Sequence, residues 1–197
     1  PNGWTFVIPN TDSVSYGYLY NNTITSKEEA IKDFIGRFDI PEIDGELTYK
    51  NYIAKNVFVG ERTLLNGNRL GFLEPMEATA LGFYQKACRV YYDYIEGDAD
   101  QLSANRKLRE EMKQIATFIL WHYQFGSKYD TPFWQYAKSL PFKPDTKFKY
   151  ILRKSRFMSG LESRFKTEHH KNFDYTEYAQ WPIKSFKVWS DHVNGSG

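Results

Sequence analysis

The stretch NGNRLGFLEPMEATALGF, residues 66–83, marks the point at which a β-rich chain becomes helical. An apolar segment that contains glycine runs into two glutamates, Glu74 and Glu77, which lie on either side of Pro75. Because proline is tolerated in the first turn of a helix, the stretch predicts a helix that begins at Pro75 or Glu77 and continues to about Ile95. Carboxylates are costly to bury without partners, so this pair requires either a structural or a chemical role.

The composition is that of a folded protein, with 25% charged and 18% aromatic residues among 197. A formal net charge of +2 gives no electrostatic case for nucleic acid or an anionic membrane. No apolar run approaches the ~20 residues of a membrane span, and the chain does not begin with a signal-peptide pattern. The single cysteine, Cys88, rules out an internal disulfide and is expected to be inert on an apolar helix face. We therefore expect a cytoplasmic protein that binds neither nucleic acid nor membrane.

Strand patterns crowd the part of the chain before residue 75. Four runs are expected to form strands: WTFVIP (4–9), VSYGYLY (14–20), LTYKNYIAKNVFVG (47–60) and RTLLNG (62–67). Residues 10–13 predict a hairpin turn between the first two runs. Ser26 and Glu29 form a capping box, which predicts a helix that continues to Gly36.

Helical patterns dominate the rest of the chain. The helix that follows Pro75 is expected to place Leu81, Tyr84, Cys88, Tyr91 and Ile95 on one face, and the next helix to carry Leu108, Met112, Ile115, Ile119 and Leu120. Thr131 and Pro132 predict the start of a short helix, and residues 145–157 and 183–193 are also expected to be helical. The sequence thus predicts an α+β fold with a β-rich part, residues 1–74, and a mainly helical part, residues 75–197.

Three blocks together resemble the flavin-dependent tryptophan halogenases. GWTFVIP (3–9) is similar to that family's Trp-x-Trp-x-Ile-Pro signature, with Phe6 in place of the second Trp. NGNRLGFLEPMEAT (66–79) is similar to its Gly-Asp-Ala-Ala-Gly-Phe-x-Glu-Pro-Leu-Glu-Ser-Thr-Gly block, and IATFILWHYQFGSKYDTPFW (115–134) to its later segment with His-Tyr and Asp-x-Pro-Phe-Trp. The order and spacing of the blocks carry the resemblance, which spans roughly residues 3–140.

The resemblance implies a flavin-binding sheet, a helical substrate-binding part and a specific chemistry. Reduced FAD, supplied by a flavin reductase, and oxygen convert halide into hypohalous acid, and a lysine assisted by a glutamate delivers the halogen to an electron-rich ring. Glu77 falls on that catalytic glutamate, which can polarise the halogenating species and accept the ring proton. The other implied site residues are Thr79 and the amide of Ala80 for the halide; Gly67, Asn68, Gly71 and Phe72 for FAD; and His122, Tyr123, Phe133 and Trp134 for an aromatic substrate such as tryptophan.

Several features depart from the family pattern. Ala80 stands where the family usually has Gly, Ala78 where it has Ser, and Asn68 where it has Asp. The chain has no Gly-x-Gly-x-x-Gly fingerprint after a first strand, and no lysine in a context that matches the delivering lysine. We therefore expect the chain to be the C-terminal part of a halogenase-like flavoprotein. Two alternatives stay open: a flavin monooxygenase or oxidase on the same scaffold, and a non-catalytic truncated fragment or helical interaction module.

Structural alternatives exist for most of these residues. Glu74 is better explained as a first-turn helix residue than as a catalytic group. Phe133 and Trp134 are equally compatible with plain core packing, and Trp4 and Phe6 are expected to be packing residues on one face of a strand. For two further features, only structural roles are expected. His169 and His170 point apart on a helix and predict no metal site, and the basic run 143–156 is expected to be a solvated helix face and no RNA-binding site.

The isolated chain is expected to bind FAD weakly or not at all, because a dinucleotide fingerprint normally supplies the helix N-terminus for the pyrophosphate. Titration calorimetry that gave micromolar or tighter FAD binding would contradict this prediction. The sheet edge and apolar surface that an absent N-terminal half would leave open should also cause self-association. A clean monomer at high concentration in light scattering would count against a truncated chain.

Overall fold

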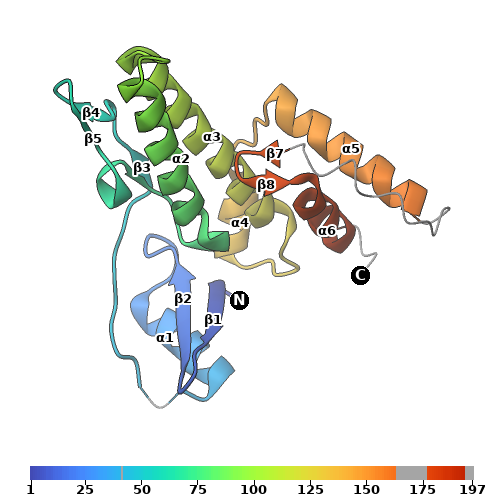
Figure 1. Ribbon diagram of the computed structural model, residues 1–197. Helices are drawn as coiled ribbons and strands as arrows, with labels where there is room; N and C mark the ends of the chain where they lie inside the picture. The colour runs from blue at the N-terminus through green and yellow to red at the C-terminus, as the bar shows by residue number, and fades with distance from the viewer. Residues whose placement is uncertain (41, 163–176, 194–197) are drawn as a thin grey trace. The chain divides into compact units, whose positions relative to one another are not determined.

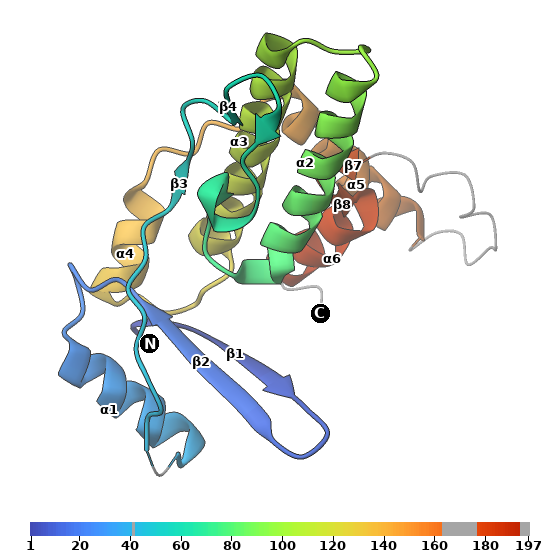
Figure 2. The ribbon, with the colours of Figure 1, turned by 60° about the vertical axis from the view of Figure 1, so that its left-hand side comes forward.

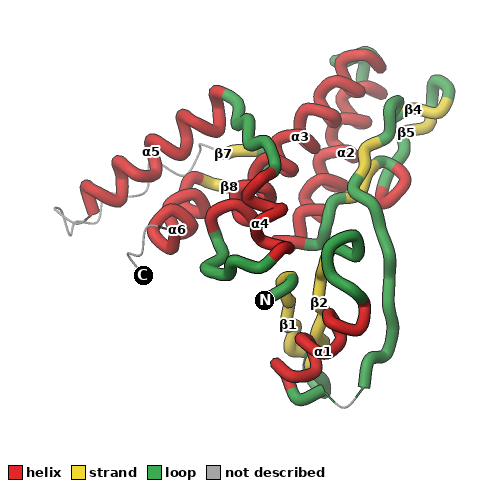
Figure 3. Tube along the Cα trace, turned by 180° about the vertical axis from the view of Figure 1, so that it is seen from behind, coloured by secondary structure: helices red, strands yellow, loops and turns green. Residues whose placement is uncertain are grey.

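The computed structural model describes residues 1–40, 42–162 and 177–193, and within them the side chains of residues 77 and 157–162 are not described. The strands are β1 (Gly3–Pro9), β2 (Val14–Tyr20), β3 (Tyr52–Ile53), β4 (Phe58–Val59), β5 (Thr63–Leu64), β6 (Gly71–Phe72), β7 (Glu177–Tyr178) and β8 (Trp181–Pro182). The helices are α1 (Lys27–Phe38), α2 (Thr79–Ile95), α3 (Gln101–Phe125), α4 (Pro132–Ser139), α5 (Thr146–Glu162) and α6 (Ile183–Val193), with short 3-10 turns η1 (Gly67–Arg69) and η2 (Met76–Ala78) before α2 (Figure 1, Figure 3). The predicted α+β class is confirmed.

The chain divides into two compact units. Unit 1 comprises Pro1–Thr48 and Trp121–Pro141, and unit 2 comprises Tyr49–Leu120 and Phe142–Gly197. These units do not coincide with the predicted parts 1–74 and 75–197, which were defined by the ligand that each part would bind. That functional division stays a prediction.

The hairpin of unit 1 forms as predicted. β1 and β2 pair antiparallel, with Trp4 opposite Leu19 and Phe6 opposite Gly17, and the Asn10 amide donates to the Ser13 carbonyl across the turn at 2.8 Å. The Phe6 ring lies over Gly17, since a Cβ at Gly17 would be 2.0 Å from it. Glycine at this position therefore makes room for a cross-strand aromatic side chain.

Helix α1 packs beside β2 (Figure 2). Its capping box is confirmed, because the Ser26 side chain accepts from the Glu29 amide and the Glu29 carboxylate accepts from the Ser26 amide. Phe34 of the buried face stacks on Tyr18 of β2, with ring centroids 5.7 Å apart. The hairpin face that carries Tyr18 is thus covered by the helix, while Trp4 and Phe6 lie on the opposite face.

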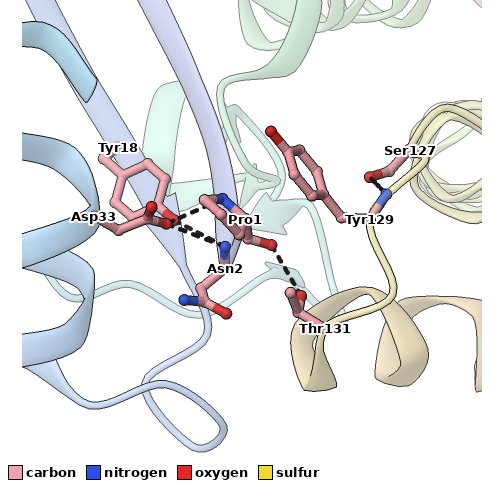
Figure 4. Close-up of polar contacts among 7 residues, drawn as sticks. All are labelled: Pro1, Asn2, Tyr18, Asp33, Ser127, Tyr129 and Thr131. Atoms are coloured by element: carbon pink, nitrogen blue, oxygen red, sulfur yellow. Dashed lines mark hydrogen bonds and ion pairs between the residues drawn. The ribbon is translucent and has the colours of Figure 1, made fainter. Parts of the chain in front are cut away.

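Asp33 of α1 anchors the start of β1 (Figure 4). Its Oδ2 accepts from the Tyr18 hydroxyl at 2.5 Å and from the Asn2 amide at 3.2 Å, and lies 3.1 Å from the Pro1 nitrogen. Burial by itself would raise the pKa of Asp33, but these hydrogen bonds and the adjacent positive charge outweigh it and lower the pKa. The same contact raises the pKa of Tyr18, for which burial is the larger cause.

The centre of unit 2 forms between α2 and α3, which lie side by side (Figure 1). The buried side chains of these helices in unit 2 are Thr79, Phe83, Ala87, Val90, Ala104, Leu108, Met112, Ile115, Phe118 and Ile119. The face predicted for α2 was wrong, since Leu81 and Ile95 are 64% and 60% exposed and Cys88 is also exposed. Apolar residues occur on two sides of this helix, so periodicity alone did not identify the side that packs on α3.

The predicted strands between residues 47 and 67 shrink to pairs of residues, β3, β4 and β5. Side chains of α2 and α3 take the place of neighbouring strands as hydrogen-bond partners. The Tyr91 and Tyr94 hydroxyls donate to the carbonyls of Arg62 and Glu61 at 2.5 and 2.7 Å, and Arg109 donates to the Ala54 carbonyl at 2.8 Å. Because these carbonyls already have partners, no longer ladder is needed.

The C-terminal part of unit 2 is held by aromatic packing. Trp181 of β8 stacks on Phe118 of α3 with centroids 3.9 Å apart, and the Tyr178 hydroxyl donates to Asp145 Oδ2 at 3.0 Å. The other Asp145 oxygen accepts from the Phe148 amide and begins α5. In the described parts of the chain, every helix is too short or too polar to cross a membrane.

Asp33→Asn is expected to lower the free energy of unfolding by about 1–2 kcal/mol near neutral pH, because it weakens hydrogen bonds to a charged acceptor. The folded-state pKa of Asp33 is lowered, so the carboxylate stabilises the fold above its ordinary pKa of 3.8 and this contribution is lost as the pH falls through the folded-state value. Urea melts of both proteins at several pH values should therefore converge in acid. Asp12→Asn, at an exposed turn position, should change little at any pH, and a difference for Asp33→Asn that did not depend on pH would contradict this account.

Candidate functional site

The predicted site residues fall into both units. The residues predicted for catalysis, halide and FAD all lie in unit 2, whereas His122, Tyr123, Phe133 and Trp134 lie in unit 1. Each group is therefore described within its own unit.

The first group surrounds the beginning of α2. Ala78 has φ 50° and ψ 30°, a left-handed conformation that is unusual for a residue with a Cβ. It lets the chain leave the 3-10 turn and enter α2, whose N-terminus has neither a side-chain cap nor an acidic residue in its first turn. Thr79 is only 1% exposed. A helix start that no carboxylate of its own first turn neutralises suits an anion, so Thr79 and the Ala80 amide fit the predicted halide.

Glu74 lies close to an aromatic pair just before this turn. Tyr49 packs edge-on against Phe72 with centroids 5.0 Å apart, and burial, followed by the charge of Glu74, raises the pKa of Tyr49 to about 12. Glu74 is itself half-buried. The backbone of Glu77 lies in η2, but its side chain is outside the described residues, so its catalytic role stays a prediction.

The glycines predicted for FAD differ in what surrounds them. Gly71 is buried, and a Cβ there would lie 2.8 Å from Met112 and 3.0 Å from the Tyr52 carbonyl, so the protein itself fills the space. Gly67 has φ +59° and faces open space. Beside it, Asn68 Oδ1 accepts from the Tyr84 hydroxyl at 2.8 Å. Gly67 and Asn68 are thus the residues of this set that fit the approach of a ligand.

The second group forms an aromatic cluster, defined here as Tyr123, Phe133, Trp134 and Ala137. Phe133 and Trp134 are perpendicular neighbours with ring centroids 5.0 Å apart, and Tyr123 lies 6.1 and 5.8 Å from them. Both α4 rings are buried, and the Trp134 Nε1 has no hydrogen-bond partner among the described residues. The cluster therefore combines flat apolar surfaces with a buried donor, whereas His122 packs against Trp121 beside it.

Three side chains that the sequence did not assign to the site hold the cluster in place. Trp4 donates its indole N–H to the Tyr123 hydroxyl at 2.5 Å. Gln124 donates to the Leu140 carbonyl at 2.5 Å and so fastens the end of α4 to α3. Thr131 occupies the predicted N-cap position, but its hydroxyl donates to the Pro1 carbonyl at 2.9 Å (Figure 4) and makes no cap hydrogen bond. The tendency of a buried indole N–H to find a partner was the available signal for Trp4.

No metal site is indicated by the described residues, among which no three His, Cys, Asp or Glu side chains come together. His169 and His170 lie outside the described residues. In the basic run, Lys149, Arg153 and Arg156 are exposed and Phe148, Ile151 and Ser155 are buried. This alternation is that of an amphipathic helix with a solvated cationic face.

Comparison with known sequences gives consistent matches. Residues 1–183 match the family described as Tryptophan halogenase. The tryptophan 7-halogenase RebH of Lentzea aerocolonigenes is 28% identical over 148 residues, which cover 70% of this chain and 27% of RebH. The tryptophan 6-halogenase SttH of Streptomyces toxytricini is 29% identical over 150 residues, with 70% and 27% covered. The chain thus spans little more than a quarter of the length of these curated relatives.

Solved structures share the fold. The thermophilic tryptophan halogenase Th-Hal from Streptomycin violaceusniger superposes with a TM-score of 0.70 at 21% identity, and the match covers 100% of this chain and 37% of that one. BrvH, a flavin-dependent halogenase from Brevundimonas sp. BAL3, gives a TM-score of 0.61 at 16% identity over 98% of this chain and 37% of its own.

Ala78→Gly is expected to raise the free energy of unfolding by about 0.5–1 kcal/mol, since glycine removes the strain of a left-handed alanine. Ala80→Gly is the matched control two residues later, in the right-handed helix, and should lower stability by about 0.5–1 kcal/mol. Thermal and urea melts of the two variants measure both effects. Equal destabilisation by both changes would contradict the left-handed turn.

Proposed function

The chain belongs to the tryptophan halogenase family, and from that premise we propose that it forms the C-terminal part of a flavin-dependent halogenase that acts on an electron-rich aromatic ring such as that of tryptophan. The observation that carries the proposal is the helix start at Thr79, which lacks a side-chain cap and a first-turn carboxylate and directly follows the turn that contains Glu77. An anion site beside a general base is the combination that this reaction requires.

Each residue of unit 2 has a defined task in this proposal. Thr79 and the amide of Ala80 hold the halide, Gly67 and Asn68 contact FAD, and bound reduced FAD supplies the oxidising power that oxygen needs to convert the halide into an electrophile. Glu77 polarises the electrophile and accepts the proton that leaves the ring. A carboxylate performs both tasks when a partly apolar site tunes its pKa.

The aromatic cluster of unit 1 supports the substrate class. Two perpendicular rings and a third about 6 Å away present the faces and edges that an indole or phenol packs against. The cluster contains no charged group. An electron-rich ring therefore meets apolar surface and one indole donor, while a flavin reductase is the partner that delivers reduced FAD.

The same scaffold would also serve a flavin monooxygenase or oxidase, because Ala78 and Ala80 stand where the family has other residues. A helical interaction module is the alternative outside enzyme chemistry. In the full-length protein, assayed with reduced FAD, oxygen, bromide and L-tryptophan, the halogenase predicts a product whose mass contains bromine. A hydroxylated product that does not depend on bromide would favour the monooxygenase, and absence of flavin binding by the full-length protein would favour the interaction module.

Glu77→Gln in the full-length protein should preserve folding and flavin binding yet reduce the halogenation rate by ~10²-fold or more, as loss of a positioned acid–base group does. Glu74→Gln is the matched control three residues earlier, and it should change stability, by ~1 kcal/mol, more than rate. Initial rates and melting curves of both variants are the measurements. Near-normal turnover of Glu77→Gln with flavin bound would remove Glu77 from the catalytic role.

A further inference from the structure

Trp4 makes the hydrogen bond that connects the hairpin to the aromatic cluster. Its indole Nε1 lies 2.5 Å from the Tyr123 hydroxyl, although the two residues are 119 positions apart in the chain. Both side chains are half-buried, so the contact excludes much of the competing water. Because the indole N–H can only donate, the Tyr123 oxygen must accept in this pair.

The donor is attached to a firm support. Trp4 lies in the antiparallel ladder opposite Leu19 and packs beside Phe6, with ring centroids 6.3 Å apart. The beginning of the same strand is fastened twice, by the Asn2 amide to Asp33 and by the Pro1 carbonyl to Thr131 of the α4 cap position (Figure 4). The indole position is therefore determined by the hairpin.

The acceptor, by contrast, has a freedom that packing alone does not remove. Rotation of a tyrosine ring about χ2 has a broad profile, so a polar partner at its tip is what fixes the plane and the hydroxyl direction. Tyr123 is also the cluster ring that lies near both of the others, Phe133 at 6.1 Å and Trp134 at 5.8 Å. A shift of Tyr123 would thus change the surface offered by both α4 rings.

We infer that Trp4 is a positioning residue for substrate binding: its indole N–H holds the Tyr123 hydroxyl and thereby fixes the aromatic cluster in the arrangement that receives an electron-rich ring. This inference rests on the proposed function. It gives the hairpin a task at the substrate side of the protein. The effect falls on recognition of the ring, and the chemical step is carried by residues of the other unit.

The test compares Trp4→Phe with Tyr123→Phe in the full-length protein, with L-tryptophan as the probe. Each change removes one partner of the hydrogen bond and keeps an aromatic ring. Each should raise KM about 10-fold, which corresponds to ~1.4 kcal/mol, with kcat changed less than about 3-fold and flavin binding unchanged. The double variant should be no worse than either single one, because both remove the same interaction.

Phe6→Leu is the control for a purely structural effect. It disturbs the same face of β1 but leaves the Trp4–Tyr123 hydrogen bond in place. It should lower the melting temperature at least as much as Trp4→Phe without changing KM. A rise in KM for Phe6→Leu in proportion to lost stability would overturn the positioning role.

A second readout does not depend on substrate. In the 197-residue chain with ¹⁵N-labelled tryptophan, the Trp4 indole N–H resonance should shift in Tyr123→Phe, and an unchanged resonance would overturn the hydrogen bond itself. Unchanged KM in Trp4→Phe would overturn the role of Trp4 while leaving the proposed function intact. Failure of the wild-type full-length protein to bind or convert L-tryptophan would overturn the proposed substrate and this inference together.

Discussion

Burial of one face of α3 is the constraint on which both cores depend. Along the first part of the helix Leu108, Met112 and Ile115 fill the centre of unit 2, and the last turns supply Tyr123 and Gln124 to unit 1. A helix of 25 residues can do this because its apolar positions recur at helical spacing throughout. Substitutions along α3 therefore act on whichever core receives the side chain concerned.

The hairpin acts as a rigid frame for unit 1. α1 covers one face through the stacking of Phe34 on Tyr18, while the other face presents Trp4 toward Tyr123. Polar groups at the start of β1 are satisfied by Asp33 and Thr131, which lie on different elements. Since side chains on packed elements are more precisely held than side chains on loops, this arrangement suits the recognition of a flat substrate.

Strain in unit 2 is concentrated where the proposed chemistry lies. Ala78 adopts a left-handed conformation immediately before an α2 start that has no side-chain cap. Each feature costs stability, and neither is needed for α2 to pack on α3, which uses Phe83, Ala87 and Val90. Costs of this kind are frequent at functional sites, where the backbone shape matters more than its stability.

The sequence by itself determined what short-range interactions control: the β1–β2 hairpin, the capping box of α1, the start of α4 at Pro132 and, through family blocks, the residues Tyr123, Phe133 and Trp134. Only the tertiary structure decided which face of α2 is buried, why residues 47–67 form mere pairs of strand residues, and that Trp4 binds Tyr123. These features depend on partners distant in the chain, 119 residues away for Trp4, and periodicity or local propensity carries no information about such partners.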